Sequence, residues 1–189
     1  DQLAATSREN SWLVNFAINR VSRLVDQSRW EEGLAANKLA REIAAQRGST
    51  YAKMLVAYYQ VCALGKLGRG GEAGEDLAYL AANGAEHPQV AAQALLCANE
   101  EGQAAELLLR ELDGDDESRA QVIKALQPPA FSLLGMPSAM PDLHDLLARH
   151  PRLREEYLRH ARFIPEGLVP ASAFRRGLVA RSEAEPPSP

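Results

Sequence analysis

The two cysteines of the chain, Cys62 and Cys97, are the first residues to consider for chemistry. They do not have the Cys-x-x-Cys spacing that favours a catalytic dithiol. Unpaired cysteines are among the residues most often buried in protein cores. We therefore predict two mostly buried free thiols in a reducing compartment. A redox pair is the alternative, because both cysteines fall on the same face of helices in neighbouring predicted hairpins.

Histidines and carboxylates gather near the C-terminal end, which raises the question of a metal site. His144, His150 and His160 occur there, together with Asp142 and Asp145. A zinc site on one helix uses two ligands four residues apart, so that both point to the same side. No two of these histidines have that spacing, and adjacent helical residues point in different directions. We predict surface or helix-capping histidines and no metal site.

Three further patterns fall short of the active sites or ligand loops that they resemble. Ser132, Ser138 and Ser172 lack the glycine pattern of a nucleophile elbow. The glycines within 65–71 lack the Lys-Ser/Thr ending of a phosphate loop and a preceding strand. The acidic segment 113–118 lacks the spaced ligands of a calcium loop and suits a helix start instead. We therefore expect no catalytic residue, no cofactor and no enzymatic activity.

The composition argues against two classes of partner. The net charge of −4 at pH 7 is not that of a dedicated nucleic-acid binder, which usually has a strongly basic footprint. No apolar run approaches the roughly 20 residues that cross a bilayer, so we expect no membrane insertion. One basic cluster is predicted to be the solvated side of a terminal helix, with an acidic partner or nucleic acid as the alternative. Its members are Arg149, Arg152, Arg154, Arg159 and Arg162.

The positions of the apolar residues predict helices along the chain. Aromatic residues make up only 6%, and Ala and Leu are abundant, which favours closely packed helices over sheet. The expected helices cover residues 11–25, 30–48, 50–65, 71–83, 88–98, 104–112, 117–126, 142–150 and 151–162. The first of them would turn one apolar face inward, made of Leu13, Phe16, Ala17, Val21, Leu24 and Val25.

One helix–turn–helix pattern occurs twice within residues 11–84. The alignment that places Leu24 on Leu64 also places Arg29 on Arg69. A third copy, reached by a shorter step, places Leu64 on Leu95. Small residues recur where the helices of a hairpin cross, and larger apolar residues recur between hairpins. This arrangement is typical of an array in which each unit buries its face only against its neighbours.

With this spacing the sequence resembles the tetratricopeptide repeat family. The resemblance rests on the segments 28–34 (SRWEEGL) and 67–73 (LGRGGEA), and it covers residues 11–112. The step from Leu24 to Leu64 exceeds the family's usual length of about 34, and Ala17 and Ala57 replace an expected aromatic. HEAT-like helix pairs, whose period is nearer this step, are the structural alternative. The predicted fold is all-α, a TPR-like α-solenoid of antiparallel helix hairpins with a helical C-terminal cap.

The resemblance implies a right-handed array whose first helices line a concave groove for a peptide or helix of another protein. The implied groove residues are Asn15, Ile18, Ser22, Asp26, Tyr58, Cys62, Lys66, Gln89 and Gln93, with Cys97 at the end of the third unit. Because several of these positions are uncharged, the cationic clamp with which one subtype holds chaperone C-termini is absent. A mixed polar and apolar groove suits an amphipathic helix or an extended segment.

The predicted organisation is a repeat array over 11–126, a connector with two capping helices over 127–165, and a partly disordered tail over 166–189. We expect a cytoplasmic protein–protein interaction module, either an adaptor or the partner-sensing domain of a larger protein. The alternative is the effector domain of a transcription regulator whose DNA-binding part lies elsewhere. Self-association stays open. The chain begins at Asp1 without Met, which fits either an excised domain or a processed chain.

Overall fold

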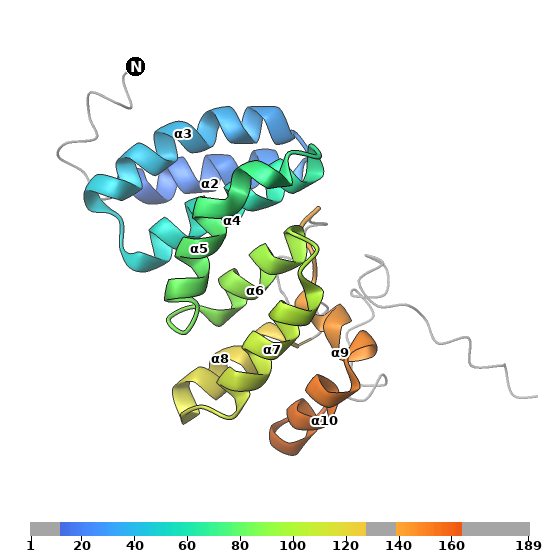
Figure 1. The fold of residues 1–189 in the computed structure, drawn as a ribbon. Helices are drawn as coiled ribbons and strands as arrows, with labels where there is room; N and C mark the ends of the chain where they lie inside the picture. The colour runs from blue at the N-terminus through green and yellow to red at the C-terminus, as the bar shows by residue number, and fades with distance from the viewer. Residues whose placement is uncertain (1–11, 128–138, 164–189) are drawn as a thin grey trace, which may run out of the picture.

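The computed structural model of the chain describes residues 12–127 and 139–163 (Figure 1). Within these two ranges the chain forms helices joined by short turns, and it contains no strand. The all-α class predicted from composition and apolar spacing is confirmed. The predictions made for the N-terminal residues, for 128–138 and for the tail after 163 lie outside the described residues.

The first three helices have boundaries that local capping explains. They are α2 (Trp12–Asp26), α3 (Trp30–Arg47) and α4 (Thr50–Lys66). Helix α3 ends at Gly48, whose backbone N–H donates to the carbonyl of Ala44 at 2.7 Å. Helix α4 begins after Ser49, whose hydroxyl accepts from the backbone N–H of Ala52 at 3.2 Å. This N-cap satisfies one of the four backbone donors that a helix start leaves unpaired.

The middle of the chain continues with shorter helices. A 3-10 turn, η1 (Gly70–Ala73), leads into α5 (Gly74–Asn83), so the regular helix begins later than its predicted start at 71. Helices α6 (Pro88–Cys97) and α7 (Glu101–Leu112) follow. Pro88 stands in the first helical turn, where its missing N–H costs no hydrogen bond.

The C-terminal elements are less regular than the predicted pair of helices. Helix α8 (Asp116–Ala125) is capped by Asp115, whose carboxylate accepts from the backbone N–H of Ser118 at 2.8 Å. The expected helix over 142–150 is a 3-10 turn, η3 (Leu143–Asp145), followed by one α-helical turn, α9 (Leu146–Arg149). Helix α10 (Pro151–His160) closes the described part of the chain.

The same turn occurs three times between successive helices, at the positions that the aligned leucines predict. Its central residues, Ser28, Gly68 and Asn99, have φ values of 60°, 72° and 62°. In each turn the following residue donates its backbone N–H at 2.8 Å to the carbonyl of a leucine five positions earlier, which is Leu24, Leu64 or Leu95. This pair of features defines the Schellman helix end, in which a left-handed residue stops the helix.

The first two of these turns also share a side-chain interaction. The guanidinium of Arg29 donates from Nε to the carboxylate of Glu32 at 2.7 Å. In the second turn Arg69 donates from Nε to Glu72 at the same distance of 2.7 Å. Both pairs are exposed, so each contributes little to stability. Their equivalence shows that the matched residues have matched local structures.

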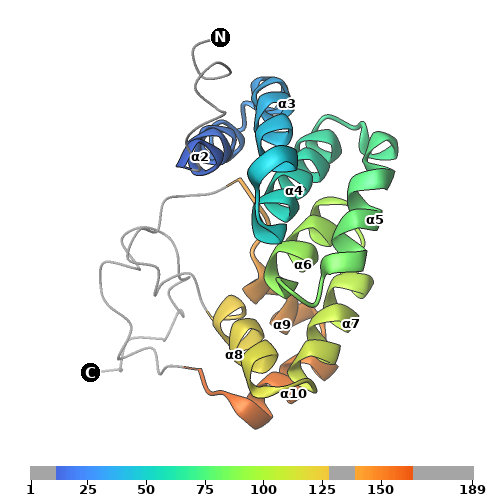
Figure 2. The same cartoon turned by 90° about the vertical axis from the view of Figure 1, so that its left-hand side faces the viewer.

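The helices pack as consecutive antiparallel pairs, α2 with α3, α4 with α5 and α6 with α7. The first helix of each pair also contacts the first helix of the next, so α2, α4 and α6 lie in a row. Figure 2 shows the pairs following one another from α2 and α3 at one end to α8 and α10 at the other. The C-terminal elements pack on the third pair, since η3 contacts α6 and α10 packs on α7.

Two apolar clusters form the core. The larger runs from Leu34 of α3 to α10 and includes the fully buried Leu64, Leu108 and Leu153. The smaller lies between α2, α3 and the start of α4, around Val21 and Ile43. Trp30, Leu55, Tyr59 and Met140 pack against both clusters and so connect them.

The first helix does not bury all of its predicted face. Leu13, Ala17, Val21 and Val25 are buried, as predicted. Phe16 is 53% exposed, and Leu24 is only partly buried, so this part of the prediction is wrong. Phe16 lines a hollow whose other lining residues belong to α2, α3 and the turn between them. Helices α2 and α3 stand at the end of the row (Figure 1).

Candidate interaction surfaces

The residues predicted to line a concave groove differ widely in exposure. Asn15 and Lys66 are exposed, and Ser22, Asp26, Gln89 and Gln93 are half-buried. Ile18, Tyr58 and Cys62 are buried, with exposed fractions of 5% or less. These three side chains belong to the core beneath the row of first helices, so they cannot contact a partner in this conformation.

A polar and aromatic cluster occupies the junction of α2 and α4. The Ser22 hydroxyl donates to the Asp26 carboxylate at 3.3 Å, and the rings of Tyr58 and Tyr59 lie 4.9 Å apart. Burial raises the pKa of Tyr58 well above its ordinary value, and the neighbouring Tyr59 and Asp26 add to the effect. Burial also raises the pKa of Tyr59, and a hydrogen bond with Ser22 lowers it in part. Both phenols are therefore neutral hydrogen-bonding groups at physiological pH.

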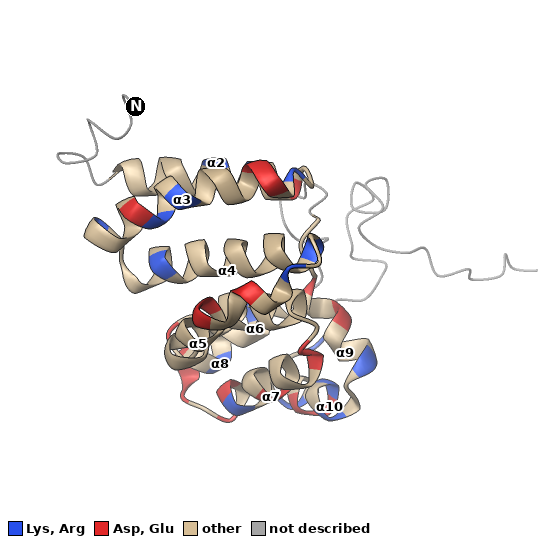
Figure 3. Ribbon diagram, turned by 45° about the horizontal axis from the view of Figure 1, so that its top comes forward, with Lys and Arg blue, Asp and Glu red and all other residues tan. Residues whose placement is uncertain are grey.

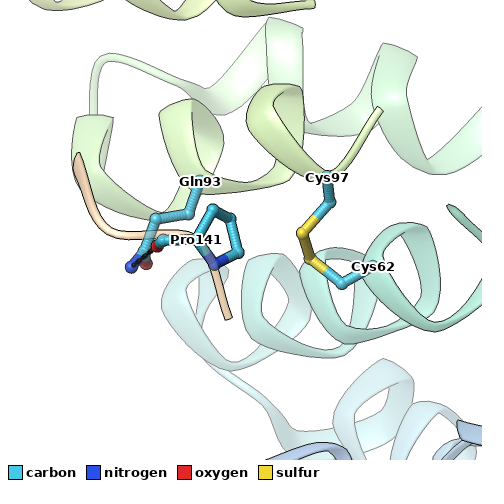
Figure 4. The surroundings of a disulfide bond; sticks show 4 residues. All are labelled: Cys62, Gln93, Cys97 and Pro141. Carbon is cyan, nitrogen blue, oxygen red and sulfur yellow. Dashed lines mark hydrogen bonds between the residues drawn. A yellow bond between two sulfur atoms is a disulfide. The ribbon is translucent and has the colours of Figure 1, made fainter. Parts of the chain in front are cut away.

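The chain itself covers the third unit of the predicted groove. The side-chain amide of Gln93 donates to the backbone carbonyl of Pro141 at 3.4 Å, and Pro141 lies beside α6 (Figure 4). The neighbouring Met140 packs against both apolar clusters. Leu143 and Leu146 are buried in the larger cluster, so this segment is part of the core.

The prediction of two free thiols is wrong, because Cys62 and Cys97 form a disulfide (Figure 4). It joins α4 to α6 with the two Cα atoms 4.8 Å apart. The helices also approach closely beside it, since a Cβ on Gly65 would lie 2.5 Å from the carbonyl oxygen of Cys97. The sequence indicated this pairing only by placing both cysteines on the same face of helices in neighbouring predicted hairpins. A cytoplasmic location, which was inferred from free thiols, loses its basis.

The C-terminal histidines have intramolecular partners. His144 Nδ1 lies 2.9 Å from the carbonyl of Leu126, and the backbone N–H of His144 is capped by Asp142 at 2.9 Å. His160 Nε2 lies 3.1 Å from the carboxylate of Glu156. These contacts hold the turn before α9 and the end of α10. Over residues 12–127 and 139–163, no group of three or more His, Cys, Asp and Glu residues could hold a metal ion.

Two of the five arginines in the cluster attach the C-terminal elements to α7. Glu101 accepts from Arg149 Nε at 2.9 Å and lies 2.8 Å from His150 Nε2. Hydrogen bonds to these two residues lower the pKa of the Glu101 carboxyl. Arg152 adds a second bridge to α7, 3.3 Å from Glu106. Figure 3 shows both signs of charge mixed along these helices. Sequence reasoning missed Glu101, because its partners belong to a distant part of the sequence.

Two hollows open between the second helices of the pairs. One, of about 270 Å³, lies between α5, α6 and α7 and has an apolar floor that includes Leu80 and Leu107. The other, of about 370 Å³, lies between α3, α4 and α5. An ion pair of 2.7 Å between Arg41 and the buried Asp76 ties α3 to α5 across this second hollow. Both hollows are shallow joints between hairpins and show no convergent catalytic groups.

Among the residues that the structure describes, the most exposed large apolar side chains lie elsewhere, at the end of the molecule formed by α2 and α3. Trp12 and Phe16 are 58% and 53% exposed, and their rings form an edge-to-face pair with centroids 6.4 Å apart. Sequence reasoning treated Phe16 as core and gave no role to Trp12. The available signal was the four-residue spacing of Trp12, Phe16, Arg20 and Leu24 along a side of the helix separate from the buried valines.

Comparison with protein-family models, curated proteins and solved structures finds no match to this chain. None of the helices that the structure describes has the length and apolar character needed to cross a bilayer. The class that the structure defines is therefore an all-α protein of paired helices with a disulfide between the second and third pairs.

Proposed function

We propose that the chain is a protein-binding module, an array of helical hairpins similar to tetratricopeptide arrays. The observation that carries this proposal is the recurring helix end at Ser28, Gly68 and Asn99. The three turns share one backbone geometry, and the first helices α2, α4 and α6 contact one another in succession. In such an array each unit is stabilised by its neighbours, and long outer surfaces remain for partners.

The partner that this module would take is an amphipathic helix or an extended segment of another protein, working as an adaptor or a partner-sensing domain. The exposed Asn15 and Lys66 mark the part of the predicted groove that α2 and α4 leave accessible. The half-buried Ser22 and Asp26 lie on α2, where the Ser22 hydroxyl donates to the Asp26 carboxylate. These side chains offer hydrogen bonds and one charge of each sign.

The disulfide also bears on where the module works. Structural disulfides persist in oxidising compartments and are rare where cellular thiols keep cysteines reduced. The Cys62–Cys97 bond therefore favours an oxidising compartment over the cytoplasm. Alkylation during extraction from the native source, followed by mass measurement without reduction, tests this: modification of both thiols would contradict it.

The function is tested by affinity capture followed by reconstitution. The oxidised chain is used as bait, and each captured protein is purified and titrated against it by calorimetry. We expect a binary complex with a Kd below about 100 μM. Asn15→Ala with Lys66→Ala tests the accessible groove, and Arg162→Ala, at the opposite end, is the matched surface control. The proposal is refuted if no captured protein rebinds the folded chain in purified form.

A further inference from the structure

The end of the molecule formed by α2 and α3 carries an aromatic pair that serves no interaction within the described core. Trp12 and Phe16 contact each other edge to face, yet each remains more than half exposed. Tryptophan and other aromatic residues are enriched at the energetic centres of protein interfaces. Among the described residues, the other exposed large apolar side chains, Tyr51 and Leu158, are 40% exposed and belong to other helices.

A groove lies directly beside this pair, between α2 and α3. Its volume is about 470 Å³, and its apolar lining consists of Phe16, Ala17, Leu24, Ala35, Ala36 and Leu39. Its alanines are small, whereas Phe16, Leu24 and Leu39 are large, so the lining is uneven. Such a shape matches the ridge of side chains along a helix, which enters grooves between neighbouring helices.

The charges around the groove are unequal. Arg29 and Glu32 lie on its edge and neutralise each other through two hydrogen bonds. Arg20 also lines the groove, and it has no ion pair within the described part of the chain. The next arginine on the same helix, Arg23, is likewise exposed and without an ion pair among the described residues. The groove therefore presents an uncompensated positive charge on a chain whose net charge is −4.

The positive charge helps to decide which kind of partner the apolar groove would bind. A second copy would pair the face with itself, so a two-fold axis near the middle of α2 would bring two copies of Arg20 close together. A membrane surface is flat and would leave the hollow between Leu24 and Leu39 unfilled. A nucleic acid calls for a broader basic surface than two arginines provide. A carboxylate flanked by apolar side chains complements the face in both charge and shape.

We propose that this face binds an acidic amphipathic helix of another protein. Apolar residues of that helix, spaced three and four apart, enter the groove, and Trp12 and Phe16 enclose them from one side. A carboxylate of the helix pairs with Arg20. This inference rests on the proposed function, since it gives the protein-binding module a second contact surface, on α2 and α3, and the chemistry of the partner that this surface takes.

The experiment uses two synthetic amphipathic helical peptides with the same leucine face. One carries glutamates beside the leucines, and the other carries lysines at the same positions. Binding to the oxidised full chain is measured by fluorescence anisotropy of a label on the peptide. We expect the glutamate peptide to bind at least about tenfold more tightly than the lysine peptide. We expect Phe16→Asp to weaken the glutamate peptide by about the same factor.

A charge reversal gives the sharper test. Arg20→Glu should invert the preference, so that the lysine peptide becomes the tighter ligand. Arg162→Glu makes the same change of charge at the other end of the molecule and should leave the preference unaltered. Circular dichroism of each variant shows that the helices are retained. Since Arg20 and Phe16 are exposed, we expect both variants to fold.

Several outcomes would overturn the inference. These are equal binding of both peptides, no binding of the glutamate peptide at millimolar concentration, and an unchanged preference after Arg20→Glu. A dimer in solution that Phe16→Asp dissociates would assign the face to a second copy instead. Retention on phosphatidylserine vesicles that Phe16→Asp abolishes would assign it to a membrane. If Phe16→Asp leaves a captured partner's affinity intact, the proposed function stands and only this surface is refuted.

Discussion

Removal of the Cys62–Cys97 disulfide is expected to lower the free energy of unfolding by about 4 kcal/mol. The two cysteines are 35 residues apart in the sequence. Closure of a loop of this length removes about 13 cal/mol/K from the unfolded chain, or about 4 kcal/mol at 25 °C. That difference corresponds to roughly a thousandfold change in the folding equilibrium. The bond joins α4 to α6, so its loss should also weaken the contact between the second and third helix pairs.

Urea unfolding followed by circular dichroism measures this effect with and without reductant. With a slope of about 2 kcal/mol per molar urea, the midpoint should fall by about 2 M on reduction. The double variant Cys62→Ala with Cys97→Ala is the control, and reductant should not change its midpoint. A midpoint of the natural chain that is insensitive to reductant would refute the reasoning, as would two alkylated thiols in the oxidised protein.

Three other predictions follow from single contacts. Gly65→Ala should destabilise the fold by about 1–3 kcal/mol in urea unfolding, because the new Cβ would lie 2.5 Å from the carbonyl oxygen of Cys97. The control is Gly102→Ala on α7, whose new Cβ would have no neighbour within 4 Å, so this variant should be neutral or slightly stabilising. Because the pKa of Tyr58 is raised in the folded protein, its neutral phenol contributes fully to the stability of the fold below the ordinary tyrosine pKa, and this contribution is lost as the pH rises above that value. An unchanged alkaline unfolding midpoint in Tyr58→Phe would refute this. Because the pKa of Glu101 is lowered in the folded protein, its carboxylate contributes fully to the stability of the fold above the ordinary glutamate pKa, and this contribution is lost as the pH falls through the lowered value. Glu101→Gln should therefore reduce the loss of stability on acidification, measured by thermal unfolding from pH 7 to pH 2.

The positions of the helices could be read from the sequence because their causes are local. The hydrogen bonds of a helix join residues four apart, and its ends depend on neighbours such as Ser49 and Pro88. The recurring helix end at Ser28 and Gly68 was predictable for the same reason, since it is set within a few neighbouring residues. The later start of α5 shows the limit of this approach, because a 3-10 turn and an α-helix have similar patterns.

The candidate sites were predicted less well, because exposure depends on what lies across the helix. The groove prediction placed Tyr58 and Ile18 on a surface, whereas both are covered by the core. It left Gln93 open, and the backbone of Pro141 covers it. The distance along the chain between Gln93 and Pro141 is 48 residues, and no local pattern relates them.

What the sequence by itself determined is the all-α class and the approximate positions of most helices, which follow from interactions within a few residues. The tertiary structure alone decided three matters. It brought Cys62 and Cys97 within bonding distance, it covered part of the predicted groove, and it left Trp12 and Phe16 exposed at the end of the row. The physical reason is that burial and pairing depend on which distant segments meet, and that is settled only when the hairpins pack.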